Sequence, residues 1–285
     1  PPPKGPPPKG PPPKGPPPPP KGPPLPPLNA SHPIATVAAS ATLMDRLPSQ
    51  LEAGHWFICG DDGSGHAFNI HAPSTADLRA PVVVYIPGAG GLSTHIAPNY
   101  QNTPVPSWAV VWNVGGKYKI RTPSYMSTFL LWLRKLTQHT HNKIILVGFS
   151  RGAAWIIDLV QTQAANIDAA VAFAGYPWTK EPWENEREAR RLMQVRIPLL
   201  LVHFDCDDLC SSTRFPKWYA QFEIGMHAPP GAGFGQRWHG FVSIMCRGVH
   251  GVGQGIFMSM DFASASDGGV LAWWNSLWEA LAQAQ

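Results

Sequence analysis

The chain has 285 residues, of which 44% are hydrophobic and 14% charged, and its formal net charge is +4. This is enough apolar material for one full-sized core or at most two small ones, and no apolar run reaches the roughly 18–20 residues of a membrane span, which argues against an integral membrane protein. The four lysines of residues 1–27 account for the whole net charge, so the neutral remainder argues against a nucleic-acid-binding domain.

Residues 1–28 form a proline-rich repeat that reads PPPKG-PPPKG-PPPKG-PPPPPKG-PPLPPL. Glycine recurs mostly at every fifth residue, which excludes collagen, where every third residue is glycine. Polyproline prefers an extended left-handed helix, so we expect a disordered, semi-rigid arm. It is either a spacer or a ligand for SH3- or WW-type domains. Because the chain opens on Pro1, we expect a fragment or a processed product, with one domain over residues 29–285.

From residue 29 onward, short β-rich runs alternate with helical patterns. The predicted strands are His55–Cys59, His66–His71, Pro81–Ile86, Trp108–Val114, Lys143–Phe149, Ala169–Ala174, Ile197–Phe204 and Phe241–Arg247. The predicted helices are Ser124–Thr137, Arg151–Ala164, Glu184–Met193, Ser212–Met226 and Gly268–Ala282. The central strands are continuous aliphatic runs, as expected where helices cover both faces of a parallel sheet. The pattern predicts a doubly wound α/β fold with a mostly parallel sheet of about eight strands.

The strongest motif is Gly148-Phe149-Ser150-Arg151-Gly152, which follows the strand Lys143–Val147 directly and precedes the helical run Ala153–Val160. A strand that turns this sharply into a helix brings chain segments close to the two outer positions, which favours glycine there. The turn lifts the hydroxyl of Ser150 above the sheet edge. The N–H of Arg151 and the positive end of the helix dipole then face the place where an oxyanion would form.

This turn resembles the nucleophile elbow of the α/β-hydrolase fold family, and the resemblance extends over most of residues 50–285. It implies an enzyme like the serine esterases and lipases, with an acid and a histidine downstream in that order and an oxyanion loop upstream. It implies no cofactor. Only a short segment separates Ala174 from the next predicted strand, where larger relatives carry a cap. We therefore expect a minimal cap and an open site suited to small or surface-displayed esters.

The expected acid follows the strand Ile197–Phe204. The run Val202-His203-Phe204-Asp205-Cys206-Asp207 resembles the family pattern V-H-G-x-x-D, with Phe204 in place of glycine. Asp207 would accept the Nδ1–H of the histidine and stabilise the imidazolium, and Asp205 and Asp208 are the alternatives. The cysteines and histidines around Asp207 lack the spacing typical of zinc ligands, so no metal site is expected.

The expected base is His250, in Arg247-Gly248-Val249-His250-Gly251, because this run resembles the family's G-x-G-H-G loop after the last strand. His239 is the alternative. It also precedes a glycine, but it comes before the strand Phe241–Arg247 and not after it, so His250 is preferred.

The expected oxyanion loop is Pro87-Gly88-Ala89-Gly90-Gly91, directly after the strand Pro81–Ile86. Family members commonly read H-G-G-G or H-G-x here, and this chain has Pro87 in the histidine position. The second oxyanion N–H is expected from Ala89, with Gly90 as the alternative. Gly88 and Gly90 let the backbone approach the substrate closely. Trp178 lies in a predicted loop at the carboxyl end of the sheet, where ligands bind in such folds, and it is a candidate for substrate contact.

The favoured interpretation is a serine hydrolase that cleaves a carboxylic ester through a Ser150–His250–Asp207 triad and an acyl-enzyme. The expected partner of the protein is a small-molecule ester substrate, and thioester or peptide cleavage is the alternative chemistry. The alternative from another class is a non-catalytic binding or scaffold module with a hydrolase-like body, presented by the proline-rich arm. The fold does not choose among these by itself.

Overall fold

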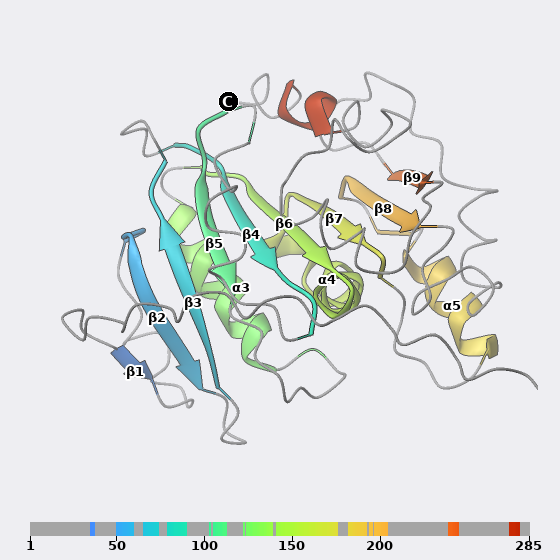
Figure 1. Ribbon diagram of the computed structural model, residues 1–285, viewed down its shortest axis with the longest axis horizontal. Coiled ribbons are helices and arrows are strands. Elements are labelled where there is room, and N and C mark those ends of the chain that lie inside the picture. Colours follow the sequence, from blue (N-terminus) through green and yellow to red (C-terminus); the bar gives the residue numbers. More distant parts are fainter. Residues whose placement is uncertain are drawn as a thin grey trace, which may run out of the picture. The chain divides into compact units, whose positions relative to one another are not determined.

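The computed structural model describes residues 35–37, 50–59, 65–73, 79–89, 103–112 except 104, 122, 124–138, 141–175, 182–204 except 193 and 196, 239–244 and 274–279. Within these residues, the chain forms one nine-stranded sheet in the order β1-β2-β3-β5-β4-β6-β7-β8-β9 (Figure 1). The strands are β1 (Ala35–Val37), β2 (Gly54–Cys59), β3 (Gly65–His71), β4 (Val82–Ile86), β5 (Trp108–Trp112), β6 (Ile144–Phe149), β7 (Ala169–Phe173), β8 (Leu199–Phe204) and β9 (His239–Ile244). β3 runs antiparallel to both of its neighbours, and the other neighbouring pairs are parallel.

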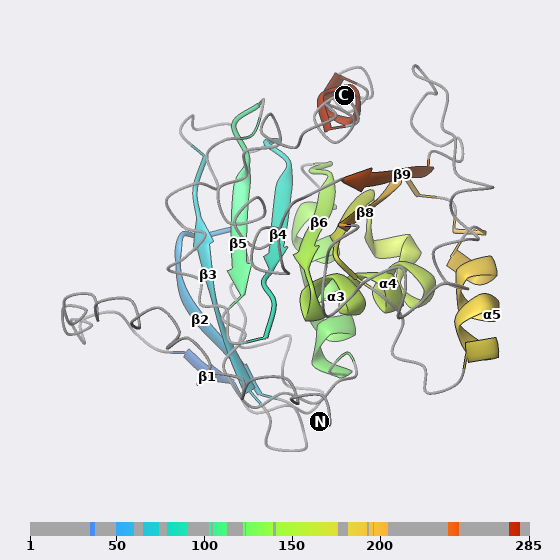
Figure 2. The same ribbon diagram turned by 45° about the vertical axis from the view of Figure 1, so that its right-hand side comes forward.

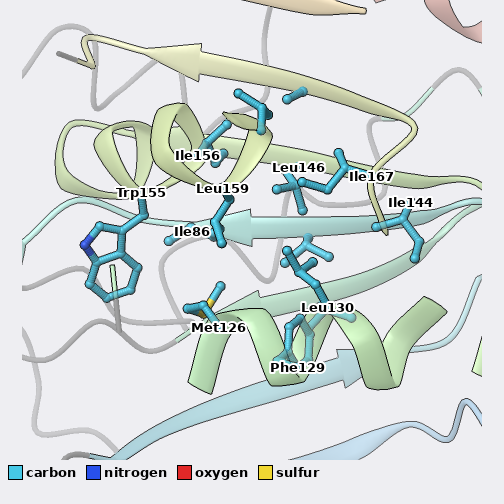
Figure 3. Packing of buried hydrophobic residues seen from close by; sticks show 14 of the residues in the cluster. Ile86, Met126, Phe129, Leu130, Ile144, Leu146, Trp155, Ile156, Leu159 and Ile167 are labelled. Atoms are coloured by element: carbon cyan, nitrogen blue, oxygen red, sulfur yellow. The ribbon is translucent and has the colours of Figure 1, made fainter. Parts of the chain in front are cut away.

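The described helices connect the parallel strands. They are α3 (Ser124–Thr137), α4 (Arg151–Thr162), the short 3-10 helix η1 (Ala164–Asn166) and α5 (Pro182–Leu192), and residues 274–279 are also helical. α3 and α4 lie on the same side of the sheet (Figure 2). Their apolar side chains share one core with alternate residues of β4 and β6, such as Ile86 and Leu146 (Figure 3). β4 and β6 are therefore held from this side by two helices.

Aromatic side chains fill the core beneath α3. The ring of Phe129 lies 4.9 Å from that of Trp112 in an edge-on arrangement, 5.3 Å from that of Phe68 and 5.5 Å from that of Trp132, measured between ring centroids. Edge-on and offset aromatic pairs of this kind stabilise a core beyond the area that they bury. Phe129 therefore joins α3 to β3 and β5.

The amino-terminal ends of β6 and β7 are tied together by Asp168. Its carboxylate accepts hydrogen bonds from Arg134 Nη2 of α3 at 2.5 Å and from the backbone N–H of Ile144 at 2.8 Å. Its own N–H donates to the carbonyl of Ile144 at 2.8 Å, and Lys143 Nζ lies 3.9 Å from the second carboxylate oxygen. One side chain thus joins α3, β6 and β7 at the edge of the sheet where these strands begin.

The predicted α/β fold and its mostly parallel sheet are confirmed. The structure adds β1, which is too short to show a recognisable alternation in the sequence. Several boundaries shift by about two residues: α5 begins at Pro182, where proline suits the first helical position, and β8 begins at Leu199, after Pro198. The predicted helix at residues 212–226 lies outside the described residues, and the last predicted helix is described only over residues 274–279.

All described residues belong to one compact unit, Ile34–Gln285. The proline-rich arm lies outside the described residues, so its disorder and its boundary at residue 28 stay predictions. Among the helices that the structure describes, none has the length and apolar character needed to cross a membrane.

Three polar side chains lie on neighbouring strands of the antiparallel part of the sheet. His55 of β2 stands directly opposite Asn69 of β3, and its Nδ1 shares a hydrogen bond with the side-chain carbonyl of Asn69. His71 comes two residues after Asn69 on β3. Its pKa is lowered from the ordinary value of 6.5, first because burial disfavours the charged imidazole and second because His55 repels that charge.

Replacing Phe129 by alanine is expected to lower the free energy of unfolding by about 3–5 kcal/mol, because it removes a ring at the centre of the aromatic core. Leu131→Ala on the same helix is the matched control. Its side chain is 50% exposed, so the change is expected to stay within about 0.5 kcal/mol. Urea unfolding of both variants measures the difference. Equal losses for the two variants would contradict this view of the core.

Replacing His71 by glutamine is expected to flatten the pH dependence of stability on the acid side. Because the folded state lowers the pKa of His71, the unfolded chain takes up its proton first, so this contribution to stability is present above pH 6.5 and is lost as the pH falls below it. Urea midpoints measured between pH 7.5 and 5.5 should therefore fall less in His71→Gln than in the unaltered chain. Parallel curves would show that His71 does not contribute.

Candidate active site

Ser150 occupies a strained turn between β6 and α4. Its backbone has φ 52° and ψ −112°, a conformation that side-chain-bearing residues rarely adopt. The turn is held by two backbone hydrogen bonds: the N–H of Ser150 donates to the carbonyl of Phe173 at 2.8 Å, and the N–H of Ala154 donates to the carbonyl of Ser150 at 3.0 Å. Ser150 precedes α4 directly, yet its side chain makes no capping hydrogen bond. The hydroxyl is therefore not tied to the helix backbone.

The two glycines of the motif are required by close packing. A Cβ atom on Gly152 would lie 1.9 Å from the carbonyl oxygen of Ile86 and 2.7 Å from that of Pro87. A Cβ on Gly148 would lie 2.7 Å from the backbone carbon of Gly152. No side chain fits at these distances, so the predicted steric reason for glycine at both positions is confirmed.

Gly88 brings the predicted oxyanion loop against the serine. A Cβ atom on Gly88 would lie 3.3 Å from Cβ of Ser150 and 3.0 Å from Cδ1 of Phe149. The parallel register aligns Ile86 with Gly148, so β4 and β6 end side by side and their following residues meet. Ala89, the next residue, is exposed. The loop and the serine, which are 62 residues apart in the sequence, therefore lie side by side.

The amino terminus of α4 lies directly after Ser150, where the second oxyanion donor is predicted. Arg151 is the first residue of this helix, and the first helical hydrogen bond starts only at the N–H of Ala154. N–H groups in a first helical turn have no partner inside the helix, and the helix dipole places positive charge there. The N–H of Arg151 is therefore suited to bind a negatively charged oxygen beside Ser150.

The register of the sheet separates His239 from Ser150. His239 is the first residue of β9 and stands opposite Leu199, the first residue of β8. Leu199 pairs with Ala170 of β7, and Ala170 pairs with Leu146 of β6. Leu146 comes four residues before Ser150 in the sequence. With ordinary strand geometry, His239 and Ser150 are about 13 Å apart along the strands and about 14 Å apart across them. His239 thus starts its strand at the edge of the sheet opposite to the serine.

The remaining predicted site residues lie outside the described residues: Asp207 with its alternatives Asp205 and Asp208, His250, Gly90 and Trp178. The strands that precede the acid and the base are described. β8 pairs with β7 and β9 pairs with β8, both in parallel, so their carboxyl ends share an edge with that of β6. The roles of these residues stay predictions.

Phe149, the variable position between Gly148 and Ser150, is not among the predicted site residues. The structure places its ring against Gly88. The pleat of β6 turns Phe149 away from the face covered by α3 and α4, but β6 is a continuous apolar run in the sequence, so no local pattern marks this residue.

Tyr85 of β4 lies two residues before Pro87 and is completely buried. Burial raises the pKa of its hydroxyl far above the ordinary value of 10.0. The group therefore stays protonated at neutral pH and does not serve as a base.

Comparison with known proteins identifies the fold. Residues 124–222, from α3 to beyond β8, match the family described as Phospholipase/Carboxylesterase. No curated protein matches the chain. Solved structures with a similar fold include a thermostable esterase (TM-score 0.54, 13% identity, covering 78% of this chain and 62% of that one), Est1E from Butyrivibrio proteoclasticus (0.51, 12%, 81% and 100%) and the esterase Pf2001 from Pyrococcus furiosus (0.52, 12%, 88% and 95%).

This chain thus spans less than two thirds of the length of the thermostable esterase. At these identities the likeness concerns the fold, which agrees with the strand order, the reversed β3 and the strained turn described above. The chain therefore has the α/β-hydrolase fold, and its residues 124–222 are similar to the phospholipases and carboxylesterases.

Proposed function

We propose that the protein is a serine hydrolase that cleaves a carboxylic ester through an acyl-enzyme on Ser150. The observation that carries the proposal is the close approach of Gly88 to Ser150: a Cβ atom added to Gly88 would lie 3.3 Å from Cβ of Ser150. It brings the loop that supplies one oxyanion donor against the residue that would attack. The match of residues 124–222 to the phospholipase/carboxylesterase family supports an ester as the substrate.

In the proposed mechanism, His250 accepts the proton of Ser150 as Oγ attacks the ester carbonyl. Asp207 accepts the Nδ1–H of His250, fixes its tautomer and stabilises the imidazolium. The carbonyl oxygen becomes an oxyanion that the N–H groups of Arg151 and Ala89 bind. His250 then protonates the leaving alcohol, and the acyl group stays on Ser150 until water, activated by the same histidine, releases the acid. No cofactor takes part in these steps.

The strained turn explains why this serine is suited to attack. Its backbone is fixed by hydrogen bonds from two sides, and its hydroxyl does not cap α4. A nucleophile and oxyanion donors that are held in place before the substrate binds need little rearrangement during the reaction, and such preorganised electrostatics are usually the largest contribution to catalysis.

The topology supports His250 over His239 as the base. His239 starts β9 at the edge where the parallel strands begin, whereas β9 ends, six residues before His250 in the sequence, at the edge where β6 ends. Asp207 likewise follows β8 by three residues. In this arrangement, the acid and the base would come from loops next to each other.

The substrate is proposed to be a small or surface-displayed ester. α5, with 11 residues, is the helix that the structure describes between β7 and β8, where a cap domain would stand. Gly88 and Gly90 would let the loop backbone approach the substrate, and Trp178 would contact its acyl or alcohol group. The proline-rich arm is proposed to be a spacer or a ligand for an SH3- or WW-type domain.

Replacing Ser150 by alanine is expected to abolish labelling by a fluorophosphonate probe and to lower kcat/KM on chromogenic esters by at least about 10⁴-fold. Ser107→Ala is the matched control, because its hydroxyl pairs with Thr103 Oγ1 at 3.0 Å and lies outside the proposed site. That variant should be labelled like the unaltered protein. Activities measured on esters of graded acyl length, on a thioester and on an anilide identify the type of bond that the protein cleaves.

Full labelling of Ser150→Ala would contradict the assignment of the nucleophile. If the unaltered protein is neither labelled nor active on any of these substrates, the non-catalytic binding module is the better interpretation. A preference for the thioester or the anilide would replace esterase by thioesterase or peptidase.

Replacing His250 by glutamine is expected to lower kcat on the preferred ester by about 10⁴-fold or more, because the base is lost. His239→Gln should keep kcat within about threefold, since the register places this residue at the opposite edge of the sheet. Steady-state kinetics, corrected for the folded fraction by circular dichroism, compare the two. The reverse result would exchange their roles.

A further inference from the structure

We propose that Phe149 is a positioning residue for the oxyanion loop, an inference that rests on the proposed function. Alternate residues of β6 face opposite sides of the sheet. Ile144 and Leu146 belong to the core shared with α3 and α4, so Phe149 points to the other side. It is 3% exposed. Its ring is therefore held in a packed environment and not in solvent.

The ring forms one wall of the space that Gly88 occupies. A Cβ on Gly88 would lie 3.0 Å from Cδ1 and 3.4 Å from Cε1 of Phe149, and 3.3 Å from Cβ of Ser150. Gly88 thus sits in a corner made by the aromatic edge and the serine. Because glycine has no side chain of its own to anchor it, the loop at this point is positioned by what surrounds it.

The preceding part of the loop is held from the opposite side. Gly152, in the first turn of α4, packs against the carbonyl oxygens of Ile86 and Pro87. Gly148 shares the face of β6 that meets α4, since a Cβ there would lie 2.7 Å from Cδ1 of Ile156. The chain from Ile86 to Gly88 therefore passes between the first turn of α4 and the ring of Phe149.

This arrangement fixes the separation between the Gly88–Ala89 peptide and Ser150. Oxyanion donors act at about 2.7–3.1 Å from the developing charge, and a displacement of about 1 Å can cost about 10²-fold in rate. Removing the ring opens space beside Gly88 while the contact with Gly152 remains. The loop can then move away from Ser150 without unfolding of the sheet.

The test compares Phe149→Leu with Phe149→Tyr, which keeps the Cδ1–Cε1 edge. Phe149→Leu is expected to lower kcat on the preferred ester by about 10²-fold with KM changed less than about threefold, because the oxyanion is bound only after attack. Affinity for an aryl boronic acid, which forms a tetrahedral adduct on serine, should fall in parallel. In Phe149→Tyr, kcat and the affinity for the boronic acid should both stay within about threefold of the values of the unaltered protein.

Phe129→Leu controls for general loosening of the core. It is the same change at a buried ring of α3 on the other side of the sheet, and it should lower the urea midpoint while keeping kcat within about threefold. If Phe149→Leu does not fold, Phe149→Met, which has a similar volume and no ring, takes its place. Unaltered kcat in the leucine or methionine variant, or equal loss in Phe129→Leu, would overturn the role of Phe149.

The outcome also separates this inference from the proposed function. If the unaltered protein does not react with fluorophosphonate, the nucleophile itself is wrong. If it reacts, and Phe149→Leu reacts at the same rate, Ser150 remains the nucleophile and only the positioning role fails.

Discussion

The first turn of α4 packs on the backbone of Ile86 and Pro87, and the site depends on this contact. The carbonyl oxygen of Ile86 occupies the space where a side chain of Gly152 would begin. Because α4 starts at this contact, the end of β4 and the start of the helix are held against each other. Ser150, two residues before Gly152, is then directed over the sheet edge beside Gly88. One backbone contact therefore brings together the proposed nucleophile, the loop and the helix terminus.

Two different constraints meet at this turn. At Gly148 and Gly152 the constraint is steric, because neighbouring backbone leaves no room for a Cβ. At Ser150 it is torsional, because the residue carries a side chain at φ 52°. Strained backbone persists only where the surrounding structure holds it, and here the hydrogen bonds to Phe173 and from Ala154 do so. The strained backbone of Ser150 therefore costs the fold some stability at the residue where the proposed chemistry takes place.

Much of this arrangement is predictable from the sequence, because continuous aliphatic strands and the G-x-S-x-G turn are local patterns. The contact between Phe149 and Gly88 is not local, since it depends on how β4 and β6 align. The same holds for His239, whose distance from Ser150 follows from the register across three strand pairs. Asp207 and His250 rest on family resemblance and on the strands that precede them, and their contacts remain predictions.

Asp168 stabilises the edge of the sheet where β6 begins, whereas Ser150 lies at the edge where β6 ends. The ties of Asp168 to Arg134 and Ile144 fasten the edge where β6 begins, six residues and about 20 Å before Ser150. Charge substitutions there alter how firmly a helix and two strands are joined, at a distance from the reacting atoms. Substitutions at Asp168 are thus expected to act on the stability of the fold, and substitutions at Ser150 on the proposed chemistry, from opposite ends of the same strand.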